Sequence, residues 1–227
     1  EKTILKYILN PEIKYSSNIN KYLKCINIIP KEIVKKLSNS EINEIIITGM
    51  GTCYTASIAI ATYMRNIFSK YAPNIIIDSH VASEGSAFHL KQNMNDVLVV
   101  VIAQSGTTID TNVYVQMAKD RGASTIAIAN KRDGDVTFLV DTTLYIGTGR
   151  DIEIAVPSTK TYTAQVVLGY ILTIYLSSCI KSNDFETYSS LLNEIKIIMK
   201  TPELIDKTFK YLNKGNVFKN VNNFPLR

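Results

Sequence analysis

Five short runs of Ile, Val and Ala are separated along this chain by stretches with the spacing of helices. The strongest run, VLVVVIA at 97–103, is apolar at every position rather than at every second one. A strand that is apolar on both sides is typical of a parallel sheet covered by helices on both faces. The pattern therefore predicts a doubly wound, flavodoxin-like α/β fold with a five-stranded parallel sheet.

The predicted α/β domain occupies roughly residues 42–180. Residues 1–41 have apolar positions at helical spacing, which predicts a helical lead-in segment. Residues 181–227 predict further helices, one beginning at Thr201-Pro202, because proline is favoured at a helix start. We expect this last region to be a linker and the opening of an incomplete second unit.

Composition excludes several classes of function. The net charge of +5 comes from scattered lysines rather than a basic stripe, so no nucleic-acid partner is expected. Cys25, Cys53 and Cys179 lie far apart without metal-ligand spacing, which indicates reduced thiols in the cytoplasm and no metal site. The longest apolar stretch, 166–176, is shorter than the ~18–20 residues that span a bilayer, so no membrane association is expected.

Three loops that follow predicted strands are rich in hydroxyl groups: TGMGTCYT, AQSGTT and VPSTKTYT. In a parallel sheet these loops meet at the carboxyl edge of the strands, where ligands bind. Each loop also precedes a predicted helix, whose free N–H groups and dipole favour an anion. The loops therefore predict a phosphate site, and the alternative is that their Ser and Thr side chains only cap helices.

Two nucleotide-binding motifs receive little support. Gly49 and Gly51 begin the dinucleotide fingerprint G-x-G-x-x-G, and Asp78 ends the next predicted strand, but Tyr54 stands at the third glycine. A dinucleotide site therefore remains only an alternative. The sequence contains no G-x-x-x-x-G-K-[ST] motif, which excludes a P-loop.

Few side chains qualify as acid–base groups. His80, His89, Glu84 and Glu153 lie near the predicted edge, but the sequence favours packing or surface roles for the histidines and a helix-start or loop-bracing role for Glu153. Cys53 lies at a predicted helix N-terminus, a position that lowers the pKa of a thiol. Because no histidine partner is evident in the sequence, we interpret Cys53 as a pocket residue rather than a nucleophile.

The succession GMGTCY, SEGSAF, VIAQSGTTIDT, STIAIAN and EIAVPSTKTYTAQ resembles the sugar isomerase (SIS) domain family. It is most similar to the first SIS domain in the isomerase half of the glutamine–fructose-6-phosphate aminotransferases. The resemblance implies a phosphosugar-binding domain that forms a homodimer and needs no cofactor. Matching the family's motifs to this chain gives the predicted substrate-binding residues: Gly51, Thr52, Cys53, Gln104, Ser105, Gly106, Thr107, Thr108, Val156, Ser158 and Lys160.

The chain departs from the family's pattern at several of these positions. Cys53 and Ala103 stand where the family has serines, Thr107 where it usually has Glu, and Pro157 where it usually has Ala. Two hydroxyls are lost, and each hydrogen bond to a charged group is worth ~1.5–3 kcal/mol. The substrate is therefore expected to be fructose 6-phosphate, glucosamine 6-phosphate or a related phosphosugar.

The family's catalytic groups have no counterpart in this chain. In the family a Glu and a His come from a second SIS domain, a Lys comes from the C-terminal tail, and a glutamine-hydrolysing domain lies upstream. We therefore expect a fragment of a two-domain enzyme that binds a phosphosugar without completing catalysis, and its catalytic residues are unassigned. The alternative is a non-catalytic regulatory protein that senses a phosphosugar.

Overall fold

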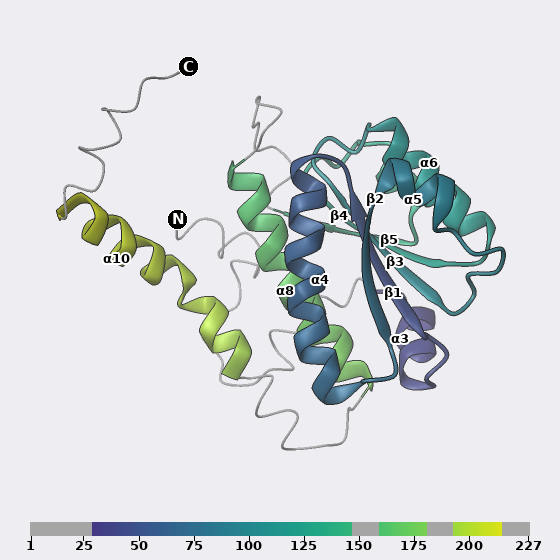
Figure 1. Cartoon of the computed structure of the whole chain (residues 1–227), viewed down its shortest axis with the longest axis horizontal. Coiled ribbons are helices and arrows are strands. Elements are labelled where there is room, and N and C mark those ends of the chain that lie inside the picture. The colour runs from purple at the N-terminus through teal and green to yellow at the C-terminus, as the bar shows by residue number, and fades with distance from the viewer. Residues whose placement is uncertain (1–28, 147–158, 181–192, 215–227) are drawn as a thin grey trace.

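A computed structural model of the chain describes residues 29–146, 159–180 and 193–214 (Figure 1). The predicted lead-in segment 1–41 lies mostly outside these residues, as do parts of the predicted region 181–227. The organisation of both regions therefore stays a prediction.

The strands form a single parallel sheet. Their order is β2-β1-β3-β4-β5, which is the flavodoxin-like order, and every neighbouring pair is parallel. The predicted fold class is thus confirmed. The strands are β1 (Glu44–Gly49), β2 (Ile76–Val81), β3 (Val97–Ala103), β4 (Ser124–Ala129) and β5 (Thr142–Tyr145).

Helices cover both faces of this sheet (Figure 1). Helices α4 and α8 pack together on one face, with α3 against α8, while α5, α6 and α7 lie on the other face. The helices are α3 (Lys31–Ser38), α4 (Thr52–Tyr71), α5 (Ala82–Phe88), α6 (Ile109–Asp120), α7 (Val136–Leu139), α8 (Thr159–Ile180) and α10 (Thr201–Lys214). The last of these begins where Thr201-Pro202 predicts a helix start.

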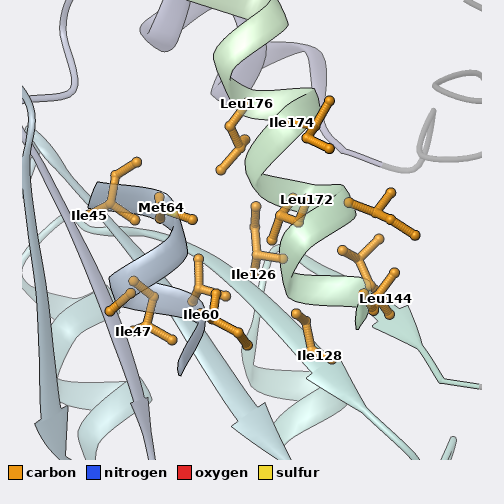
Figure 2. Packing of buried hydrophobic residues seen from close by; sticks show 14 of the residues in the cluster. Ile45, Ile47, Ile60, Met64, Ile126, Ile128, Leu144, Leu172, Ile174 and Leu176 are labelled. Atoms are coloured by element: carbon orange, nitrogen blue, oxygen red, sulfur yellow. The ribbon is translucent and has the colours of Figure 1, made fainter. Parts of the chain in front are cut away.

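The continuous apolar strands fill both layers because successive side chains point to opposite faces. Ile45 and Ile47 of β1 lie in the core beneath α4 and α8, whereas Ile46 lies in the core beneath α5 and α6. Figure 2 shows the first of these cores, where side chains of α8 such as Leu172 face Ile126 of β4. Burial on both faces explains why these strands lack alternation.

Helix α8 corrects one of the sequence arguments. Its stretch Lys160–Ile180 is long and apolar enough to cross a membrane, so the length of the apolar run 166–176 does not exclude a span. Within the fold, however, Leu172, Ile174 and Leu176 are fully buried against α4 and the sheet. A core helix passes the same test of length and composition, and α8 is therefore weak support for a membrane span.

Strand β2 also differs slightly from the expectation. It continues to Val81, so Asp78 lies inside the strand rather than at its end. The side chains of Asp78 and Ser79 are only partly buried because β2 is an edge strand, and their polarity gave a false strand end. This placement removes the acidic residue that the dinucleotide fingerprint requires after a strand.

Candidate functional site

The candidate site lies where the strand order reverses. Strand β1 leads into α4 on one face of the sheet, and its neighbour β3 leads into α6 on the other face. The loops after these strands therefore diverge at the carboxyl edge, and in doubly wound sheets loops that diverge in this way border the crevice in which ligands bind. This topology places the predicted residues Gly51–Cys53 and Gln104–Thr108 on either side of one crevice.

The loop after β3 turns its carbonyl groups toward the protein. The carbonyl oxygen of Gln104 accepts a hydrogen bond from the backbone N–H of Lys131 at 3.2 Å. That of Gly106 accepts from the backbone N–H of Val136 at 3.0 Å and from the Asn112 amide at 3.3 Å. Donors from the loop after β4, from α7 and from α6 thus hold the acceptor side of this loop and fix its orientation.

The donor side of the same loop is free within the described residues. The backbone N–H groups of Ser105, Gly106 and Thr108 have no acceptor there, and the Thr108 side chain does not cap α6. Gly106 has a left-handed φ of 73°. Ser105 Oγ accepts from the N–H and the hydroxyl of Thr107 at 3.3 and 3.0 Å, so its own proton can be donated outward. Unpaired donors at a helix N-terminus form a cradle suited to an anion.

Two glycines allow this loop to pack closely on the loop after β4. A Cβ atom at Gly106 would lie 2.8 Å from the Cα atom of Gly134. The close contact is possible only without side chains at both positions. The cradle therefore has a rigid backing on its carbonyl side.

The start of α4 forms the opposite wall of the crevice. Gly51 precedes this helix with a φ of 57°, and the helix has no side-chain cap. A Cβ atom at Gly51 would meet nothing within 4 Å, so the space beside it is open. Thr52, the first helical residue, is partly exposed. Among the described residues the N–H groups of Gly51 and Thr52 have no acceptor, so this wall offers two backbone donors and the Thr52 hydroxyl to a ligand.

Cys53 corrects the expectation of a lowered thiol pKa. Its side chain is only 8% exposed, and its sulfur accepts a hydrogen bond from the Gln165 amide at 3.6 Å. Burial raises the pKa of this thiol, and hydrogen bonds from Gln165 and the Gln104 backbone oppose the rise only in part. The effect of the helix terminus is therefore outweighed by burial, and Cys53 is held within the protein.

The structure describes only some of the remaining predicted residues. Val156 and Ser158 lie outside the described residues, so their positions stay predictions. Lys160 is exposed in the first turn of α8. The sequence analysis assigned no role to Asn112, whose amide holds the Gly106 carbonyl, or to Gln165, whose amide holds the end of β3. Gln165 is the last residue of the motif EIAVPSTKTYTAQ, which is the signal that could have identified it.

The two histidines lie on the edge strand β2, where His80 pairs with Thr48 of β1, and at the end of α5. His80 of the edge strand β2 stacks on His89 at the end of α5, with ring centroids 4.3 Å apart, and lies 3.6 Å from the carboxylate of Asp78. Burial lowers the pKa of His80, and Asp78 raises it by less. Among the residues that the structure describes, no group of His, Cys, Asp or Glu could hold a metal ion.

A flavodoxin-like sheet with an unpaired donor cradle at its switch point defines a class of α/β domains suited to phosphorylated ligands. Residues 37–175 match the model of the SIS domain, and the chain belongs to this family. The sequence resemblance to SIS domains is thus confirmed.

Known relatives and structures agree with this assignment. The chain is similar to glutamine–fructose-6-phosphate aminotransferases from Thermococcus kodakarensis (31% identity, 80% of this chain, 29% of the relative) and Fusobacterium nucleatum (27%, 85% and 30%). Its fold is similar to the C-terminal domain of glucosamine-fructose-6-phosphate aminotransferase from Francisella tularensis, with a TM-score of 0.64 at 23% identity over 93% of this chain and 56% of that one. The chain spans less than a third of the length of these two curated relatives.

Proposed function

We propose that this SIS domain binds a sugar 6-phosphate in the crevice between β1 and β3. The observation that carries the proposal is the loop after β3, whose carbonyls at Gln104 and Gly106 are held by protein donors while its N–H groups at 105, 106 and 108 have no partner among the described residues. A phosphate needs many short donors, and this loop supplies them at the start of α6.

The proposal gives each wall of the crevice a role. The Ser105 and Thr108 hydroxyls and the backbone N–H groups between them hold the phosphate oxygens. The amide of Gln104 supports the same group. Gly51 and Thr52, on the opposite wall, face the sugar, with Ser158 and Lys160 near the start of α8 as further contacts.

We further propose that the domain serves an isomerase of the glutamine–fructose-6-phosphate aminotransferase type. Both relatives described above carry that name. On this proposal fructose 6-phosphate or glucosamine 6-phosphate is the ligand, and groups beyond this domain move the protons. The relatives give no support to the alternative of a phosphosugar-sensing regulator.

Two further proposals concern the state of the protein. A homodimer is expected for an SIS domain of this type, and a cytoplasmic location is expected for a domain of a sugar-phosphate enzyme. Sedimentation equilibrium of the purified chain tests the first of these. A monomer at all concentrations would contradict the proposed dimer.

Thermal unfolding in the presence of sugars tests the binding proposal. A ligand that binds only the native state at one hundred times its Kd stabilises it by about 2.7 kcal/mol. We expect fructose 6-phosphate and glucosamine 6-phosphate to raise the Tm. Fructose and glucosamine without phosphate serve as controls and should have no effect. The proposal is wrong if millimolar phosphosugar leaves the Tm unchanged.

A further inference from the structure

Gln165 is a buried polar side chain that makes its hydrogen bonds outside its own helix. It lies on α8 and is only 1% exposed. Two other buried polar groups of α8 bond within the helix: the Thr173 hydroxyl donates to the Gly169 carbonyl at 2.8 Å, and the Ser177 hydroxyl donates to the Thr173 carbonyl at 2.9 Å. Gln165 differs from Thr173 and Ser177 because it connects α8 to other elements.

The amide of Gln165 reaches both walls of the crevice. Its Nε2 atom donates to the carbonyl oxygen of Ala103, the last residue of β3, at 3.2 Å. The same atom lies 3.6 Å from the sulfur of Cys53, the second residue of α4. Because a backbone carbonyl can only accept a hydrogen bond, the atom facing Ala103 must be the NH₂ group. One amide therefore joins the end of β3 to the start of α4.

Close packing of α8 on α4 makes this reach possible. Gly169 lies one turn after Gln165 on the same side of α8, and a Cβ atom at Gly169 would overlap the side chain of Ile60 of α4. The absence of a side chain at Gly169 brings the two helices together. Gln165 is thereby held against the end of β3 and the start of α4.

We infer that Gln165 is a positioning residue that sets the separation between the phosphate-binding loop after β3 and the sugar-facing start of α4. This inference rests on the proposed function. Gln165 itself is buried behind the crevice and acts through Ala103 and Cys53. A ligand that bridges both walls needs their spacing to be correct, whereas a ligand held by one loop does not.

Titration calorimetry of the whole chain tests this inference with two probes, fructose 6-phosphate and inorganic phosphate. Q165M removes the donor at similar size. We expect the variant to bind fructose 6-phosphate about tenfold more weakly. If the two walls are no longer correctly spaced, the ligand loses about one hydrogen bond, and this loss lowers its affinity by a factor of about ten. Inorganic phosphate, which contacts only the loop after β3, should lose less than about threefold.

Thr173→Val is the matched control on the same helix. It removes a buried hydroxyl that bonds only within α8, so any general loosening of α8 should appear here too. We expect both probes to bind the control as tightly as the wild type. An equal loss for both probes in Q165M, or an unchanged affinity for fructose 6-phosphate, would overturn the inference.

A second variant, Q165E, covers the case in which Q165M does not fold. A protonated carboxyl group can donate one O–H to the Ala103 carbonyl, whereas the ionised form cannot. We therefore expect the affinity of Q165E for fructose 6-phosphate, relative to the wild type at each pH, to fall as pH rises. A constant ratio would overturn the inference, and a wild type that binds no phosphosugar would overturn the proposed function and this inference with it.

Discussion

The starts of α4 and α6 face each other across the crevice and differ in how the protein supports them. Both helices follow a glycine with a left-handed φ, of 57° at Gly51 and 73° at Gly106, and neither has a side-chain cap. At α6 the glycine is buried and the hydroxyls that follow are exposed. At α4 the glycine is exposed and the Cys53 side chain is buried. The wall at α6 is therefore rigidly backed and presents donors, while the wall at α4 is open.

The largest expected effect of this difference is on stability. Gly106→Ala adds a Cβ atom to a left-handed residue and forces it against Gly134, 2.8 Å away, which should cost about 3 kcal/mol. Gly51→Ala meets no neighbouring atom and adds only backbone strain, about 2 kcal/mol, because a φ of 57° with a ψ of −126° is unfavourable for alanine. Urea unfolding of the two variants measures both free energies. Equal losses would mean that the two walls are supported alike.

An effect of intermediate size is expected at Thr108, where ligand binding and helix capping predict different results for the same substitution. The Thr108 hydroxyl makes no cap hydrogen bond, so Thr108→Val should leave the free energy of unfolding almost unchanged, whereas loss of a true cap costs about 1 kcal/mol. If the hydroxyl holds a phosphate oxygen, affinity for fructose 6-phosphate should fall about tenfold. Unfolding and calorimetry on the same preparation distinguish these cases.

Thr55→Val is the matched control at α4. Its hydroxyl contacts the Gly51 carbonyl at 3.4 Å within the first turn. We expect no change in affinity for this variant. A loss of stability without a loss of affinity in Thr108→Val would restore the interpretation of this loop as an ordinary helix cap.

The fold could be predicted from the sequence because its signal is local. Each interior strand contains a continuous apolar run, at 45–47 in β1, 97–103 in β3 and 126–129 in β4. Helices α4 and α6 each begin after a loop with glycine or hydroxyl residues. The sequence analysis ended strand β2 too early, at Asp78, because the residues of an edge strand face solvent and lack the apolar signal. The position of the QSGTT loop at the carboxyl edge follows from parallel strand order alone.

The support of the candidate site could not be predicted in the same way. Asn112 and Gln165 contact the loop after β3 from opposite faces of the sheet, at sequence separations of 6 and 62 residues from their carbonyl partners. Nothing in the local sequence indicates which buried amide will meet which carbonyl, because helix packing decides it. The prediction of a lowered pKa for Cys53 was wrong for the same reason. The position of a residue at a helix start can be inferred from the local sequence, whereas its burial depends on the packing of distant elements.

The smallest expected effect concerns that thiol. A variant with Cys25→Ser and Cys179→Ser leaves Cys53 as the single cysteine. Because burial raises its pKa above the ordinary value of 9.0, alkylation by iodoacetamide should be slow at neutral pH and rise only in alkaline solution. The protonated thiol is favoured in the folded state, so its contribution to stability is complete below pH 9.0 and is lost as pH rises through the folded pKa. The urea-unfolded chain, in which the thiol is exposed, provides the reference rate. Fast alkylation of the native protein at neutral pH would show that the helix terminus lowers the pKa of Cys53 by more than burial raises it. The start of α4 would then present an ionised thiol to the crevice, and the contrast between the two walls would be smaller.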